Sequence, residues 1–176
     1  MDIDILPAVE GDAAEMADLI NSCYRGDSSR KGWTTEADLL DGGRTDAAAV
    51  RELLKRADTT ILKCVRDNRI IGTVELRREN HRLYLGMLTV EPDLQGAGIG
   101  KKLLHAAEEH ATARSCNTIF MTVISVRKEL IDWYVRHGYK LTGERKEFKF
   151  NEPRFGIPKQ KLEFVVLEKR LGPQSA

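Results

Sequence analysis

The stretch MLTVEPDLQGAGIGKKLLHAAEEHA, residues 87–111, runs from apolar residues through a proline and a glycine cluster into a segment with helical spacing. Three glycines fall within five residues, at Gly96, Gly98 and Gly100. A turn from strand into helix leaves the first N–H groups of the helix without intrahelical acceptors, and the helix dipole adds positive charge there. Because glycines let an anion approach these donors, the stretch predicts a pyrophosphate cradle. A turn needed only for tight packing is the alternative that these residues leave open.

Two familiar phosphate-binding motifs do not fit this stretch. A P-loop, GxxxxGK[ST], would need glycine in place of Gln95 and serine or threonine in place of Lys102. A dinucleotide fingerprint, GxGxxG, would need glycine in place of Lys101 or Leu103. These mismatches argue against binding of ATP or NAD at the cluster.

Composition and charge are those of an ordinary globular protein, with 41% hydrophobic residues, 31% charged residues and a formal net charge of +1. So little excess positive charge argues against nucleic acid as a partner. The first residues have neither a basic segment nor a long apolar run, so we expect a cytoplasmic protein that does not bind membranes. Cysteines and histidines lack the spacing of metal ligands, so we expect reduced thiols and no metal site.

The apolar pattern predicts one domain over residues 1–170, followed by a short tail, residues 171–176. Runs of β-branched and aliphatic residues predict strands at about 3–8, 59–65, 69–78, 82–90, 118–123, 139–143 and 162–168. Helical spacing predicts helices at about 12–23, 34–40, 46–57, 98–113 and 127–137. This order indicates an α/β (α+β) fold, with one mixed, mostly antiparallel sheet of about seven strands flanked by helices.

Two motifs on these elements resemble those of a known family. QGAGIG, residues 95–100, resembles the acetyl-CoA loop Q-x-x-G-x-G of the GCN5-related N-acetyltransferase (GNAT) superfamily. YVRHGY, residues 134–139, resembles that superfamily's YxxxG[FY] element, and the predicted order of elements follows its fold over residues 3–168. More locally, residues 24–40 and 127–169 are similar to a small, largely uncharacterised subfamily, which offers no substrate to carry over.

The resemblance implies a splayed pair of strands that holds acetyl-CoA, with these residues around it. It implies that the pyrophosphate is held by the loop amides of Gln95, Gly96, Ala97, Gly98, Ile99, Gly100 and Lys101. It implies that the pantetheine arm and the thioester carbonyl meet backbone groups of Leu88, Thr89 and Val90. Gly86 fits either the bulge that such a splay needs or close packing against a neighbour. Arg127 stands where many relatives have asparagine, and it would pair with a phosphate or cap the helix.

The resemblance also implies direct attack of an amine on the thioester. Tyr134 matches the position of the general acid, which protonates the departing thiolate. No glutamate lies on the strand over residues 83–90, where several relatives carry one, so Glu75, Glu36 and a water relay stay open as the base. The acceptor pocket is expected between the first two helices, at Tyr24, Arg25, Trp33 and Glu36.

The sequence therefore predicts an acyl-CoA-dependent N-acyltransferase that moves an acetyl group from acetyl-CoA to a primary amine of a small molecule or amino-acid-like acceptor. Two alternatives stay open: a protein lysine or N-terminal acetyltransferase, and a non-catalytic acyl-CoA-binding module. Residues 140–161 mix basic and aromatic side chains. We expect them to border the acceptor groove or form a homodimer contact rather than bind nucleic acid.

Overall fold

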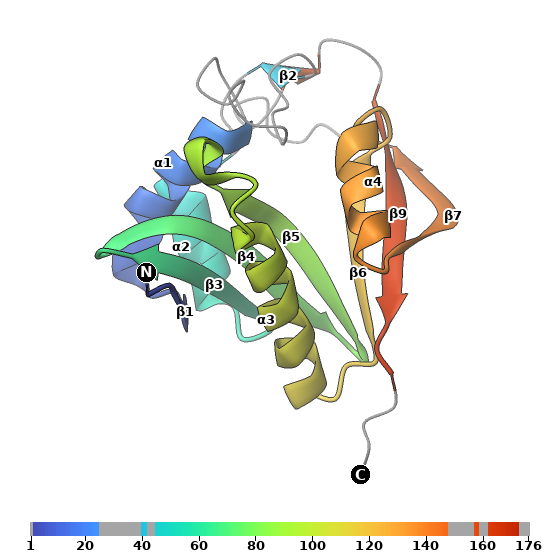
Figure 1. The fold of residues 1–176 in the computed structure, drawn as a ribbon, viewed down its shortest axis with the longest axis horizontal. Helices are drawn as coiled ribbons and strands as arrows, with labels where there is room; N and C mark the ends of the chain where they lie inside the picture. Colours follow the sequence, from blue (N-terminus) through green and yellow to red (C-terminus); the bar gives the residue numbers. More distant parts are fainter. Residues whose placement is uncertain (1, 25–39, 42–44, 148–156, 159–161, 173–176) are drawn as a thin grey trace.

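A computed structural model describes residues 2–24, 40–41, 45–147, 157–158 and 162–172 (Figure 1). Its main sheet has seven strands in the order β1-β3-β4-β5-β6-β9-β7. Their bounds are β1 (Asp4–Pro7), β3 (Thr59–Arg66), β4 (Arg69–Glu79), β5 (Arg82–Val90), β6 (Thr118–Ile124), β7 (Lys140–Glu147) and β9 (Glu163–Arg170). All neighbours in this sheet are antiparallel except β5 and β6, which are parallel. The predicted mixed, mostly antiparallel sheet is confirmed.

A second, two-stranded sheet pairs β2 (Leu40–Asp41) with β8 (Ile157–Pro158). The sequence pattern predicted neither strand. The prediction of a helix that ended at Leu40 is wrong at that residue, because Leu40 pairs with Pro158 across the small sheet. The rest of that predicted helix lies outside the described residues. A two-residue strand is too short for the alternation of side chains that reveals a strand in a sequence.

Helices cover both faces of the main sheet (Figure 1). Their bounds are α1 (Ala13–Tyr24), α2 (Ala47–Lys55), α3 (Ile99–Ala113) and α4 (Lys128–Arg136). Side chains of α1 and α2 bury Ile61 and Ile70 in one apolar cluster. Side chains of α3 and α4 form a larger cluster with the opposite face of the sheet. Because successive strand residues alternate between faces, Leu62 belongs to the larger cluster and Ile61 to the smaller one.

The parallel pair β5 and β6 separates along its length, as Figure 1 shows. Only three residue pairs join the two strands, and the last of them is Tyr84 with Phe120. β5 continues to Val90 and β6 to Ile124 without further pairing between them. The predicted splayed pair is therefore present, with the loop of residues 95–100 following its open end.

A β-bulge lies at the point where β5 leaves β6. The register between β4 and β5 shifts between Gly86 and Thr89, so that β5 carries one extra residue. Met87 adopts the left-handed region, with φ of 46°, and the hydroxyl of Thr89 donates to the Met87 carbonyl at 2.9 Å. Gly86 is next to the bulge and also faces a crowded site, since a Cβ there would lie 2.8 Å from Cε2 of Tyr84. Both predicted explanations of this glycine therefore apply.

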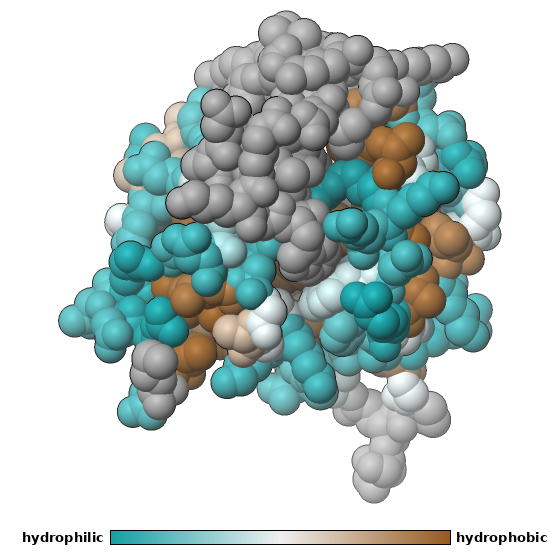
Figure 2. Space-filling view, turned by 45° about the horizontal axis from the view of Figure 1, so that its top comes forward, coloured by the Kyte–Doolittle hydropathy of each residue, from teal (hydrophilic) through white to brown (hydrophobic). Residues whose placement is uncertain are grey.

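The surface seen in Figure 2 is mostly hydrophilic, and its hydrophobic side chains lie in separate small patches. Among the described residues, no helix is both long enough and apolar enough to span a bilayer. The three cysteines are buried and carry free thiols.

Candidate active site at the open end of the sheet

The glycine loop delivers unpaired amides at the start of α3. Gly98 is the N-cap of this helix, and the first intrahelical bond runs from the Lys102 N–H to the Gly98 carbonyl at 3.1 Å. The N–H groups of Ile99, Gly100 and Lys101 therefore have no acceptor within the helix. Gly96 and Gly98 have φ of 92° and 84°, and a Cβ at either position would meet nothing within 4 Å. Open space above left-handed glycines beside free amides fits a diphosphate group.

Gly100 has a different role from the two glycines before it. A Cβ at Gly100 would lie 3.3 Å from Cζ2 of Trp133 and 3.8 Å from a methyl of Val90. The third glycine of the cluster thus lets the α4 indole pack on the first turn of α3. Packing, which the sequence left open as an alternative for the whole cluster, explains this one glycine. Ile99 likewise sends its side chain into the core, so only its N–H faces the loop.

The loop is fixed to the end of β5 through the carbonyl of Val90. This carbonyl accepts from the side-chain amide of Gln95 and from the thiol of Cys23, each at 3.1 Å. Burial raises the pKa of the Cys23 thiol to about 12, so the thiol stays protonated and acts as a donor. Gln95 therefore ties the loop to the strand with its side chain. The backbone N–H groups of Gln95 and Ala97 donate to the carbonyls of Pro92 and Leu94, at 3.5 and 3.3 Å, so these two of the predicted loop donors are already paired.

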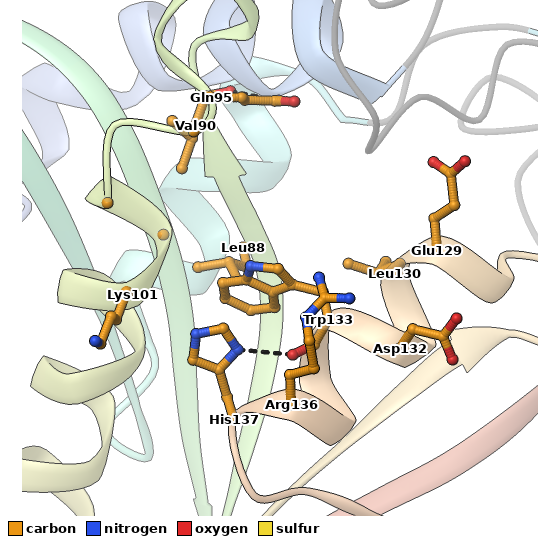
Figure 3. A pocket seen from close by; sticks show the side chains of 13 residues that line it. Leu88, Val90, Gln95, Lys101, Glu129, Leu130, Asp132, Trp133, Arg136 and His137 are labelled. Atoms are coloured by element: carbon orange, nitrogen blue, oxygen red, sulfur yellow. Dashed lines mark hydrogen bonds between the residues drawn. The ribbon is translucent and has the colours of Figure 1, made fainter.

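A cavity of about 530 Å³ lies beside the free amides at the start of α3 (Figure 3). Leu88 and Val90 of β5 border it beyond the last pair with β6, and Lys101 lies on its α3 side. The cavity therefore extends from the free amides along the end of β5 that no longer pairs with β6, and α4 forms its other side. Its remaining lining is made of Gln95, Gly96, Gly98, Gly100, Glu129, Leu130, Asp132, Trp133, Arg136 and His137.

The α4 side of this cavity was missed from the sequence. Its lining residues on and directly after α4 run from Glu129 to His137 with spacings of one, three and four, as one face of a helix does. Nδ1 of His137 lies 2.7 Å from the Trp133 carbonyl, so this nitrogen carries the proton and donates (Figure 3). The centroids of the Trp133 and His137 rings lie 4.2 Å apart, with the ring planes tilted by 37°, and the two rings form an aromatic wall of the cavity. Residues three or four positions from Tyr134 along the helix, such as Leu130 and His137, belong to this face, so the helical spacing in the sequence could have indicated it.

Tyr134 is buried in α4, with 4% of its surface exposed. It lies edge-on to Trp133 at 5.1 Å and to Tyr139 at 5.8 Å, and it is not among the residues that line the cavity. Arg127 is also buried, at the N-cap of α4, where its N–H donates to the Ile124 carbonyl at 3.0 Å. Thr89 is buried as well, and its hydroxyl donates to the Met87 carbonyl in the bulge.

Glu75 lies on the opposite face of the sheet from this cavity. It pairs with Ile61 and Gly86, and Ile61 packs against α1 and α2, so the Glu75 side chain is on that face. Its exposure is 6%, and Oε1 would lie 3.2 Å from a Cβ at Gly86. Glu75 is therefore beside the gap on the far side from the glycine loop.

The predicted acceptor residues are mostly outside the described part of the chain. Arg25, Trp33 and Glu36 lie among residues 25–39, and Tyr24 is described only as the last residue of α1. Among the described residues, no group of three or more histidine, cysteine or acidic side chains is arranged to hold a metal ion.

Comparisons with known proteins agree with this geometry. Residues 39–152 match the family model described as acetyltransferase (GNAT) domain. The chain therefore belongs to the GNAT acetyltransferase family. Its fold is that of PaiA N-acetyltransferase from Thermoplasma acidophilum, solved in complex with coenzyme A, with a TM-score of 0.70 and 17% identity over 97% of this chain and 100% of that one.

Two further relatives show how far the similarity reaches. The ribosomal-protein-S18-alanine N-acetyltransferase of Escherichia coli has a TM-score of 0.71 and 10% identity over 99% of both chains, which shows the fold alone. The spermine/spermidine N(1)-acetyltransferase of Bacillus subtilis (strain 168) is 31% identical over 67 residues. That match spans 38% of this chain and 44% of the relative.

Proposed function

We propose that this protein is an N-acetyltransferase that moves an acetyl group from acetyl-CoA to a primary amine of a small molecule or amino-acid-like acceptor. One observation carries the proposal: the cavity joins the free amides of α3 to the end of β5 that no longer pairs with β6. A diphosphate at the amides and a pantetheine arm along the unpaired end of β5 fit this shape. Membership of the GNAT family and the curated relatives named for spermine and spermidine support amine acetylation.

Acetyl-CoA would supply the activated acetyl group as a thioester. The N–H groups of the loop and of the first turn of α3 would hold its diphosphate, with the charges of Lys101 and Arg136 nearby. The apolar side chains of Leu88 and Val90 and the indole of Trp133 would exclude water from the arm that leads to the gap.

The acceptor would approach from the α1 and α2 face, where Glu75 lies. A bond forms between the amine nitrogen and the acetyl carbon, the carbon–sulfur bond breaks, and the electron pair of that bond leaves with the sulfur. Glu75, or a water that it orients, would take the proton from the amine, and Tyr134 would protonate the thiolate. Backbone N–H groups near the bulge would stabilise the developing oxyanion. The products are an N-acetyl amide and free coenzyme A.

The test is release of thiol from acetyl-CoA with a panel of amines, amino acids, polyamines and peptides. The buried protein thiols keep the background of a thiol-reactive dye low. We expect Tyr134→Phe to lower kcat roughly a hundredfold while affinity for coenzyme A stays the same. Tyr139→Phe is the matched control, because Tyr139 is also a buried phenol of this motif but bonds to Glu108 at 3.4 Å.

Each outcome separates the alternatives. Equal kcat in wild type and Tyr134→Phe would show that this tyrosine is not the general acid. Tight binding of acetyl-CoA without thiol release for any acceptor would instead support a non-catalytic binding module. Release with peptides alone would identify a protein acetyltransferase.

A further inference from the structure

Lys169 of β9 joins the two helices that line the cavity beside the glycine loop. Its Nζ donates to Oε1 and Oε2 of Glu108 on α3, at 3.0 and 3.3 Å. The same Nζ donates to the carbonyl of His137, directly after α4, at 3.2 Å. An ammonium group has three donors, enough for all of these contacts. Glu108 lies about 14 Å along α3 from Ile99, so the bridge holds the far part of this helix to the end of α4.

The bridge is largely shielded from water. The side-chain exposures of Lys169 and Glu108 are 29% and 19%. The ring of Tyr139, a residue with 1% exposure, lies 5.6 Å from the ammonium and covers it from below. His137 is the C-cap of α4, so its carbonyl lies at the negative end of the helix dipole, which favours a cation there. Partial burial and hydrogen bonds on both sides make this ion pair stronger than an exposed one.

The bridge also crosses the gap between β5 and β6. In Figure 1, α3 lies on the side of β4 and β5, whereas α4 and β9 lie on the side of β6. Of the ion pairs that join two described residues, only that of Lys169 and Glu108 connects these two sides. A second contact, the packing of Trp133 at Gly100, joins the helices near the loop. Since β5 and β6 share only three residue pairs, the separation of the two helices depends on side-chain contacts such as these.

The carbonyl that Lys169 holds belongs to a residue of the cavity wall. The ring of His137 lines the cavity beside Trp133, and its Nδ1 donates to the Trp133 carbonyl at 2.7 Å (Figure 3). Lys169 is not among the described residues that line the cavity. Any effect of Lys169 on a bound ligand is therefore transmitted through the backbone of His137 and the position of α4.

We propose that Lys169 is a positioning residue for coenzyme A: by bridging Glu108 and the His137 carbonyl, it sets the separation of α3 and α4 and so the width of the cavity. This inference rests on the proposed binding of acetyl-CoA in that cavity. Without the bridge, α4 is free to move away from α3, and part of the free energy of coenzyme binding is needed to bring it back. The bridge thus raises affinity without touching the ligand.

Lys169→Met tests this role, because it keeps the aliphatic stem and removes the ammonium. If the cavity then has its binding width in about a tenth of the molecules, calorimetry should show coenzyme A bound about tenfold more weakly. KM for acetyl-CoA should rise by a similar factor in the thiol-release assay, while kcat stays within about twofold, because bound coenzyme restores the width. Lys169→Arg, which keeps a cation with several donors, should recover part of the affinity. Glu108→Gln, of the same shape, should weaken binding in the same direction, and it decides the question if Lys169→Met does not fold.

Lys63→Met is the matched control. Lys63 donates to Oδ2 of Asp12 at 2.7 Å, and each side chain is 17% exposed, so this pair is at least as buried as the bridge. Both residues lie on the β5 side of the gap, so the control loses a comparable ion pair without loosening α4. It should lose stability in urea, as Lys169→Met does, but keep the wild-type affinity for coenzyme A.

The outcomes separate this inference from the proposed function. Unchanged coenzyme affinity in both Lys169→Met and Glu108→Gln overturns the positioning role and leaves the proposed function standing. An equal loss of affinity in Lys63→Met does the same, because it would show general destabilisation. Wild type that does not bind coenzyme A overturns both.

Discussion

Replacing Gly98 by glutamate tests the cradle at the start of α3. Any side chain at this position must adopt φ of 84°, a strain of about 1–2 kcal/mol on the folded state. The space above it is open, because a Cβ would meet nothing within 4 Å. A glutamate side chain there would extend into the region where we place the diphosphate. Gly98→Gln adds the same bulk and the same strain without a charge, so the comparison of the two variants isolates the electrostatic effect.

The size of that effect follows from Coulomb's law. At about 6 Å and an effective dielectric constant of about 20, each pair of like charges costs roughly 3 kcal/mol, and salt at physiological strength screens part of it. We therefore expect Gly98→Glu to bind coenzyme A about 10- to 100-fold more weakly than Gly98→Gln. Isothermal titration calorimetry at low and high salt measures both affinities, and the difference between them should shrink as salt rises. Equal affinities of the two variants at low salt would refute the placement of the diphosphate.

Two further changes probe other parts of the molecule. Gly86→Ala should raise KM for the acceptor severalfold without changing affinity for coenzyme A, because its Cβ displaces the Tyr84 ring. Steady-state kinetics and calorimetry measure the two quantities. Gly11→Ala is the control, because a Cβ at Gly11 has no neighbour within 4 Å. Burial, with a smaller contribution from the charge of Arg114, lowers the pKa of His110 to about 4. Below pH of about 6.5 the unfolded chain therefore binds a proton at His110 that the folded chain does not bind. The folded state loses stability as the pH falls through this range. Between pH 7 and 5, the free energy of unfolding in urea should fall by about 1 kcal/mol more for wild type than for His110→Gln, after allowance for solvent screening of this half-buried ring. An equal fall in both proteins would contradict the lowered pKa.

The sequence predicted those parts of the site that depend on local backbone physics. The glycine loop and the start of α3 follow from the unpaired amides of a helix N-terminus and from glycines that tolerate positive φ. The splay of β5 from β6 was predicted only through the family resemblance. The bulge at Met87 had no local signal of its own, because methionine does not favour the left-handed region; only Gly86 beside it suggested a departure from regular strand.

What the sequence did not predict depends on which elements meet in space. A tryptophan beside Tyr134 on an amphipathic helix also fits plain core packing, and only the contact with Gly100 shows that the indole of Trp133 reaches the first turn of α3. Glu75 was one of several candidates for the base, since nothing local distinguishes a buried glutamate from a solvated one. Its position became informative once the register placed it opposite Gly86 and beside the gap.

The three residue pairs between β5 and β6 also divide the hydrogen-bonded network of the main sheet. Strands β1, β3, β4 and β5 form one hydrogen-bonded group, and β6, β9 and β7 form another, so a short seam of three residue pairs at the closed end joins the two groups. Amide hydrogen exchange should therefore be faster along the free edges of this seam than within either group. A ligand that lies between the two groups would add hydrogen bonds to both and slow the exchange of amides in each. Protection against exchange would then report occupancy across the whole sheet, well beyond the residues that the ligand contacts.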